Sequence, residues 1–151
     1  MSAALTGAWQ LQRWSARLPE GGTGLPFGEK PQGVLVYSAD RTMCSAFAHA
    51  DRAPLGEQLA ASRRYWQGLD KVAPPGESEI TSRLLKAALG FNAYAGRYTL
   101  EGDRIHHDVE VAFFPDWIGR RLTRRFRLEG GSLSLSFESQ GQEDTLVWTR
   151  R

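Results

Sequence analysis

Cysteine is almost absent from this sequence, in which Cys44 is the only one among 151 residues. A lone cysteine cannot form a disulfide within the chain, and such usage is typical of a reducing compartment. No stretch approaches the roughly 20 apolar residues that span a bilayer. The first residues also lack the basic region and apolar run of a signal peptide. We therefore expect a soluble, cytoplasmic protein without a membrane partner.

Metal-ligand spacings and nucleophile motifs are also missing. His106 and His107 are adjacent, and adjacent residues of a strand face opposite sides, so the pair is unsuited to one metal ion. The sequence contains no glycine-rich phosphate loop and no nucleophile elbow around a serine. The formal net charge is only +2, which gives little reason to expect a nucleic-acid partner. We predict no metal and no cofactor, and the sequence does not indicate an oligomeric state.

Most of the chain shows the alternation of apolar and polar residues that is typical of half-buried strands. We expect strands at residues 5–14, 33–38, 42–49, 92–100, 104–114, 120–128, 132–138 and 145–150, and helices at 56–69 and 78–91. The segment 19–31 is rich in glycine and proline and predicts a loop, which is either a lid over a cavity or a plain connector. The length suits one domain better than two, so we expect a single domain over residues 1–151.

The eight expected strands are joined mostly by short turns, which favours up-and-down order. The predicted fold is all-β, an eight-stranded up-and-down antiparallel barrel with two helices inserted between strands 3 and 4. Closing such a sheet removes its exposed edges. The interior of an eight-stranded barrel is either filled by side chains or just wide enough for one small ligand.

The expected strand at residues 104–114 is the most informative one. Its apolar face carries one titratable residue, and the members of this face are Ile105, His107, Val109, Val111 and Phe113. On the next strand Arg124 shares a face with apolar residues, although a bulge would place Arg125 inside instead. Two neighbouring strands therefore each send one polar side chain into an otherwise apolar interior.

Several short motifs follow one another along the chain. They are Gly7-x-Trp9, Gly33 with Tyr37-Ser38, Tyr94-x-Gly96-x-Tyr98, His107-x-Val109-Glu110, Pro115-x-Trp117-x-Gly119, Arg124 and Trp148-x-Arg150. In this order and spacing the sequence resembles the bacterial and fungal lipocalin-like domain family over residues 5–150. The resemblance implies a calycin-type barrel with a central cavity, in which Trp9 and Arg150 stack at the closed end. It implies no single reaction, because fold alone does not set function.

The sequence departs from the secreted lipocalins in two respects. Their Thr-Asp-Tyr motif is absent, and so are the cysteines of their disulfides. The resemblance therefore does not imply that the protein carries ligands in extracellular fluid.

One functional hypothesis is a barrel that binds a small hydrophobic molecule, with an anionic or phenolic oxygen on the ligand. Apolar walls would supply affinity, while His107 and Arg124 would fix the orientation of the ligand. A filled barrel that acts as a protein-interaction module is a further alternative. The candidate ligand-binding residues are Tyr37, Met43, Phe47, Tyr94, Tyr98, His107, Val109, Val111, Phe113, Arg124, Leu133, Leu135 and Phe137.

A second hypothesis is an enzyme of secondary metabolism on the same cavity, of the isomerase, cyclase or dehydratase type. His107 would move a proton, Arg124 would stabilise a developing oxyanion, and Tyr98 would assist. The competing structural roles are a buried His107 bonded to a neighbouring tyrosine or a backbone group, and an Arg124 that bonds a carbonyl or pairs with Asp108 or Glu110. The other arginines of residues 120–127 predict a solvated surface that is paired across strands.

Overall fold

The computed structural model describes residues 2–56, 63–64, 67–68 and 77–151. These residues form two compact units, one over Met1–Ala50 with Asn92–Arg151 and the other over Asp51–Phe91. Because of this division, the single domain over residues 1–151 stays a prediction. No helix among the described residues is long and apolar enough to span a membrane.

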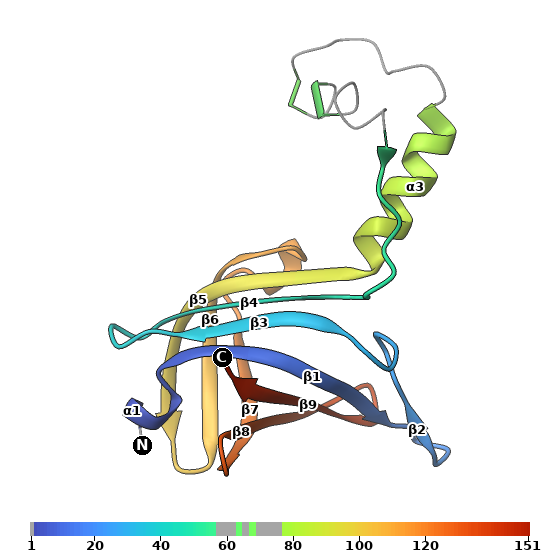
Figure 1. Ribbon diagram of the computed structural model, residues 1–151. Coiled ribbons are helices and arrows are strands. Elements are labelled where there is room, and N and C mark those ends of the chain that lie inside the picture. Colours follow the sequence, from blue (N-terminus) through green and yellow to red (C-terminus); the bar gives the residue numbers. More distant parts are fainter. Residues whose placement is uncertain (1, 57–62, 65–66, 69–76) are drawn as a thin grey trace. The chain divides into compact units, whose positions relative to one another are not determined.

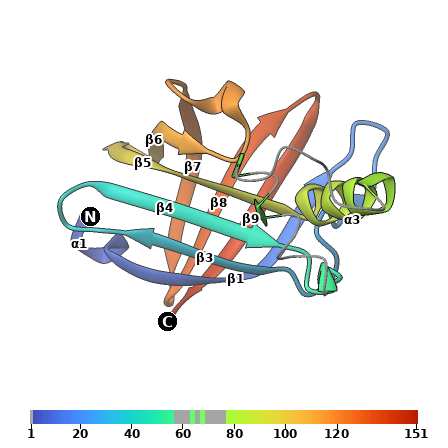
Figure 2. The ribbon, with the colours of Figure 1, turned by 90° about the horizontal axis from the view of Figure 1, so that it is seen from above.

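The larger unit is a closed antiparallel β-barrel, as predicted (Figures 1 and 2). Each strand pairs with its neighbour along the barrel, and pairing of the first long strand with the last one closes it. A two-residue strand, β2, pairs only with the end of β1, so eight long strands form the wall. The strands are β1 (Gly7–Arg17), β2 (Thr23–Gly24), β3 (Gln32–Tyr37), β4 (Thr42–Ala48), β5 (Phe91–Glu101), β6 (Arg104–Ala112), β7 (Arg121–Glu129), β8 (Ser132–Ser139) and β9 (Gln142–Arg150).

Three helical elements have bounds that lie wholly within the described residues. They are α1 (Ser2–Leu5), α3 (Glu77–Leu89) and the 3-10 turn η2 (Pro115–Trp117). Helix α3 lies between β4 and β5 in the sequence and confirms the second predicted helix, and Gly90 follows its last residue. Most of the first predicted helix, 56–69, lies outside the described residues. In the smaller unit, Arg52 Nε donates to the carbonyl oxygen of Ala87, which is 2.9 Å away.

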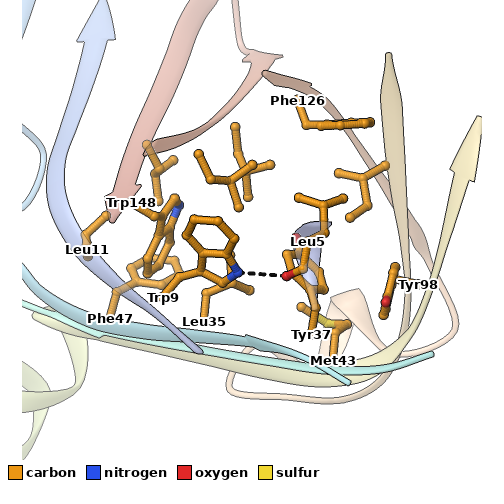
Figure 3. Close-up of a cluster of buried hydrophobic side chains, with 14 of the residues drawn as sticks. Leu5, Trp9, Leu11, Leu35, Tyr37, Met43, Phe47, Tyr98, Phe126 and Trp148 are labelled. Atoms are coloured by element: carbon orange, nitrogen blue, oxygen red, sulfur yellow. Dashed lines mark hydrogen bonds between the residues drawn. The ribbon is translucent and has the colours of Figure 1, made fainter. Parts of the chain in front are cut away.

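One end of the barrel is filled by large side chains (Figure 3). Trp9 is fully buried, and its Nε1 donates to the carbonyl oxygen of Leu5 at 2.9 Å. The guanidinium of Arg150 stacks over the Trp9 ring at 4.5 Å and donates to Thr6 at 2.8 Å. A Cβ on Gly7 would lie 2.7 Å from that guanidinium, which explains the glycine two residues before the tryptophan. The predicted stacking of Trp9 and Arg150 is therefore present.

A β-bulge in β6 changes which side chains face the interior. Gly96 pairs with Val109 whereas Ala95 pairs with Val111, so Glu110 is an extra residue in β6. The alternation of sides therefore reverses beyond it. Val109 is buried, but Val111 is 64% exposed and Phe113 is 40% exposed. The prediction that Val111 and Phe113 face the interior is wrong, because strict alternation cannot anticipate the extra residue.

Strand β7 places Arg124 on the interior side, as predicted. It shares this side with Phe126, whereas Arg125 is exposed and lies 3.6 Å from a carboxylate oxygen of Asp103. Strand β8 pairs with β7 only from Arg125 onward. Between Arg121 and Arg124 the strand pairs with β6 alone, and Figure 2 shows β7 and β8 diverging there. Arg124 therefore lies in a part of β7 that pairs with β6 but not with β8.

Candidate functional site

A cavity of about 250 Å³ lies inside the barrel, beside the filled end. It is bordered by side chains from near the ends of several strands, among them Phe47 of β4, Asn92 of β5 and Gln142 of β9. Phe47 lies near the last residue of β4 and Asn92 near the first residue of β5, at the same end of the barrel. The cavity thus occupies the end of the barrel opposite to Trp9 and Met43.

Five of the predicted ligand-binding residues line this cavity, and they are Phe47, Tyr94, Arg124, Leu135 and Phe137. Others are buried in the packed interior and do not border the cavity. These are Tyr37, Met43, Tyr98, His107, Val109 and Leu133. Val111 and Phe113, as described above, lie on the outside.

Several lining residues were not predicted. Trp14 reaches the interior because β1 contains a register shift between Leu11 and Arg13. Asp144 lies in β9, which begins at Gln142, three residues before the expected strand start. The first error concerns an irregular position that a simple alternation cannot reveal, and the second concerns the start of a strand. The remaining lining residues that sequence reasoning missed are Leu35, Ser45, Asn92, Phe114, Trp117, Ser139, Gln142, Leu146 and Trp148.

Aromatic rings form much of the cavity wall. The Trp14 ring meets the Phe47 ring edge-on with centroids 5.5 Å apart. Trp117, from the turn η2, meets Tyr94 edge-on at 5.6 Å. Phe27 comes from the glycine- and proline-rich loop and packs on Trp14 at 4.8 Å. This loop therefore packs an aromatic side chain against Trp14, which lines the cavity, although Phe27 is not itself a lining residue.

His107 is held between two tyrosine hydroxyl groups. Its Nε2 lies 2.8 Å from the hydroxyl of Tyr37, and its Nδ1 lies 3.0 Å from the hydroxyl of Tyr94. Burial, reinforced by the positive charge of Arg124, lowers the pKa of His107 from its usual value near 6.5 to about 3. The ring is therefore neutral at pH 7. Its contacts match the structural role that we set against catalysis.

Both tyrosine partners of His107 remain protonated. Burial raises the pKa of Tyr37 well above its usual value and also raises that of Tyr94, against the opposing effect of the Arg124 charge. Tyr98, the third tyrosine of the interior, donates its hydroxyl to the carbonyl oxygen of Ser38 at 2.9 Å. Its hydroxyl is thus used within the fold.

Arg124 is the cationic group of the cavity. Its guanidinium lies over the ring of Phe137, with 3.9 Å between its central carbon and the ring centroid, and it donates to the Thr123 carbonyl at 3.1 Å. Among the described residues no carboxylate forms an ion pair with it, so neither Asp108 nor Glu110 is its partner. Asp108 instead binds Arg121 through two hydrogen bonds, of 2.7 and 3.0 Å.

Asp144 is the acidic group of the cavity, and it is 1% exposed. Its two carboxylate oxygens accept hydrogen bonds from the Trp14 indole at 2.7 Å and from the Gln142 amide at 2.9 Å. Two buried polar atoms at the cavity have no hydrogen-bond partner within the described part of the chain. They are Oδ1 of Asn92 and Nε1 of Trp148.

The outer surface of β6 and β7 carries an ion pair across the two strands, of the kind predicted, and another within β7. Arg121 binds Asp108, and Arg127 binds Glu129 at 2.8 Å. His106 faces outward but is only 8% exposed, because it lies between Thr123 at 2.9 Å and Glu101 at 3.1 Å. His106 therefore faces outward without being freely solvated. The described residues contain no group of His, Cys, Asp and Glu that could hold a metal ion.

A closed eight-stranded barrel with an interior cavity defines the class of this protein. The family model for the lipocalin-like domain matches residues 6–151, so the chain belongs to the lipocalin-like domain family. This confirms the resemblance and the barrel. No curated protein matches the sequence significantly.

Solved structures of similar fold include two proteins from Bacteroides species and a fluorescent protein. A lipocalin-like protein from Bacteroides uniformis is 14% identical, with a TM-score of 0.47 over 98% of this chain and 99% of that one. An uncharacterized protein from Bacteroides eggerthii is 12% identical, with a TM-score of 0.46 over 97% and 99%. A mutant of the fluorescent protein UnaG is 11% identical, with a TM-score of 0.43 over 99% and 98%. These likenesses are too distant to argue for a particular ligand.

Proposed function

We propose that the protein binds a small hydrophobic molecule that carries an anionic oxygen, such as a carboxylate, an enolate or a phenolate. The observation that carries this proposal is the Arg124 guanidinium, which borders an aromatic cavity without an ion-pair partner among the described residues. A charge that is partly removed from water needs a counter-charge or hydrogen bonds to offset its lost hydration. The planar fork of a guanidinium suits a planar oxyanion.

The size and lining of the cavity support a small, flat ligand. Its volume of about 250 Å³ is near the lower limit of the roughly 300–1,000 Å³ that ligand pockets span. The rings of Trp14, Phe47 and Phe137 offer flat apolar surfaces on which another ring can pack. A molecule of one or two rings fits these dimensions.

The contacts support binding over acid–base catalysis. His107, the proposed proton carrier, does not border the cavity, and both of its ring nitrogens are hydrogen-bonded to tyrosines. Tyr98 also lies away from the cavity and bonds the Ser38 carbonyl. Of the three residues assigned to the isomerase, cyclase or dehydratase hypothesis, only Arg124 reaches the cavity. The cytoplasmic location and the absence of a nucleic-acid partner stay predictions.

The proposal can be tested with 2-naphthoate and its neutral methyl ester. We expect isothermal titration calorimetry to show that Arg124→Gln weakens binding of the acid at least tenfold and leaves binding of the ester within twofold. Arg125→Gln is the matched control, because Arg125 is the exposed neighbour on the same strand. Equal affinity of wild type and Arg124→Gln for the acid, or no binding of any aromatic acid in a wider panel, would contradict the proposal.

A further inference from the structure

The contacts of Tyr37, His107 and Tyr94 form a chain of hydrogen bonds that ends at the cavity. Tyr37 comes from β3, His107 from β6 and Tyr94 from β5. The two bonds measure 2.8 Å and 3.0 Å. Tyr37 and His107 are fully buried in the barrel interior and do not border the cavity, whereas Tyr94 does. The positions of the hydrogen atoms in these two bonds determine whether the Tyr94 hydroxyl is a donor or an acceptor toward a ligand.

The position of each proton follows from the number of donors. A neutral imidazole carries one N–H and one acceptor nitrogen. The hydroxyl of Tyr37 is buried, and His107 Nε2 is its hydrogen-bond partner among the described residues. If Nε2 carried the hydrogen, the Tyr37 O–H would be left without an acceptor, which is costly for a buried group. Tyr37 therefore donates to Nε2, and the hydrogen of His107 resides on Nδ1.

The hydroxyl of Tyr94 then becomes an obligatory donor. Its oxygen accepts the Nδ1–H of His107, so its own hydrogen cannot point along that bond. Arg124 lies beside Tyr94, where its positive charge opposes the rise in the pKa of the Tyr94 hydroxyl, but a guanidinium has no acceptor atom. The Tyr94 hydrogen must therefore point to an acceptor in the cavity.

Asn92 supplies the complementary group two residues earlier on the same face of β5. Its side chain is 6% exposed, and its Oδ1 has no partner among the described residues although it borders the cavity. A buried carbonyl oxygen of this kind calls for an O–H or N–H donor. Trp148 Nε1, also buried and without a partner there, adds one more donor to the lining.

We propose that the ligand is an aromatic acid of one or two rings that also carries a hydroxyl or N–H group. Its oxyanion accepts hydrogen bonds from Tyr94 and Arg124, and its hydroxyl or N–H donates to Asn92. Tyr37 and His107 are positioning residues that keep the Tyr94 hydroxyl directed at the ligand. This inference rests on the proposed function and narrows its ligand class.

The arrangement of protons is tested directly by nuclear magnetic resonance. In ¹⁵N-labelled wild-type protein at pH 7, we expect the imidazole nitrogen shifts to assign the hydrogen of His107 to Nδ1. Loss of this preference is expected in Tyr37→Phe, which removes the donor to Nε2. A wild-type His107 with its hydrogen on Nε2 would overturn the proton arrangement, and this measurement does not depend on how well a variant folds.

The role of the chain in binding is tested by titrating 2-naphthoate into three variants. Tyr37→Phe and Tyr94→Phe are expected to weaken binding at least fivefold, even though Tyr37 does not border the cavity. Tyr98→Phe is the matched control, because Tyr98 is an equally buried tyrosine whose hydroxyl bonds Ser38 instead. Its affinity is expected to stay within twofold of wild type. If all three variants bind alike, Tyr37 and His107 have no positioning role.

The role of Asn92 is tested with the hydroxynaphthoate isomers whose hydroxyl is remote from the carboxylate, each beside its methyl ether. At least one isomer should bind wild type fivefold more tightly than its ether, and Asn92→Ala should reduce this preference to within twofold. No preference for any hydroxyl would overturn the assignment of the donor group. If binding of acids needs Arg124 but none of these other residues, the inference fails and the proposed function stands. If acids do not bind at all, both fail.

Discussion

His107 is a buried group whose protonation differs between the folded and unfolded chain. In the folded protein its pKa is about 3, because burial and the nearby Arg124 charge disfavour the imidazolium. In the unfolded chain the pKa returns to about 6.5. The unfolded chain therefore binds the proton more tightly, so the folded state loses stability as the pH falls below about 6.5 toward 3.

Replacement of His107 by glutamine should remove this pH dependence. Glutamine offers a donor and an acceptor to the two tyrosines but does not titrate. Between about pH 6 and 4 the free energy of unfolding of wild type should fall by about 1.4 kcal/mol per pH unit more than that of His107→Gln. Urea unfolding at several pH values measures the difference. Parallel pH profiles for the two proteins would mean that His107 takes up no proton on unfolding.

For single residues, the sequence predicts whether a side chain points into the barrel better than it predicts which side chains it contacts. Alternation correctly predicts that His107 and Arg124 point inward, since each lies on a regular part of its strand. The bond from His107 to Tyr37 joins residues 70 positions apart, and no local pattern connects them. The position of Arg124 beside Phe137 likewise depends on the divergence of β7 and β8.

Among the elements, β5 and β6 depend on one glycine. A Cβ on Gly96 would lie 2.0 Å from the carbonyl oxygen of Asp108, a backbone atom that cannot move freely. The absence of a side chain lets the two strands approach each other at the bulge, where Glu110 is the extra residue. This approach sets which residues of β6 face inward beyond Val109.

Gly96→Ala should therefore destabilise the barrel by about 1–3 kcal/mol, the usual cost of overpacking a dense interior. The control is Gly24→Ala, because a Cβ there would make only ordinary contacts, the nearest at 3.7 Å to Leu18. The control should change the free energy of unfolding by about 0.5 kcal/mol or less. The denaturant midpoints of the two variants measure these changes in stability. Equal destabilisation by Gly96→Ala and Gly24→Ala would mean that the bulge tolerates a side chain.

The sequence predicts the eight long strands of the barrel but not the irregular positions within them. Short turns and alternation locate all eight long strands, because each apolar row must face one interior. The shift in β1 that brings Trp14 inward and the bulge in β6 that turns Val111 outward are missed. Each of these positions adds one residue, and one residue is enough to exchange the two faces of a strand. The shift in β1 accounts for the missed lining residue Trp14.

The molecule as a whole is closed by contacts between its first and last long strands. Strand β1 pairs with β9 from Trp9, opposite Arg150, to Arg17, opposite Glu143. Arg150 adds side-chain bonds to the carbonyl oxygens of Ala4 and Thr6 and a cation–π contact with Trp9. These contacts join the chain before β1 to the last residues of β9.

Arg150→Ala should lower the free energy of unfolding by about 1–3 kcal/mol, as expected for charge-assisted hydrogen bonds together with a cation–π contact. The neighbouring Arg151→Ala is the control, because Arg151 is exposed and its side chain contacts Gln10 on the surface. The control should stay within about 0.5 kcal/mol of wild type. Thermal unfolding monitored by circular dichroism measures the stability of both variants. Equal destabilisation by the two substitutions would mean that the contacts of Arg150 add no particular stability.

Pairing of β1 with β9 also determines the order in which the chain can fold. Hairpins such as β3–β4 or β8–β9 join residues close in sequence, whereas the pairing of Trp9 with Arg150 encloses almost the entire chain in one loop. Contacts of such high sequence separation are slow to form, because the loop entropy is lost before the contact is gained. During synthesis β1 must therefore wait for β9 to leave the ribosome, and until then its edge has no permanent neighbour on that side.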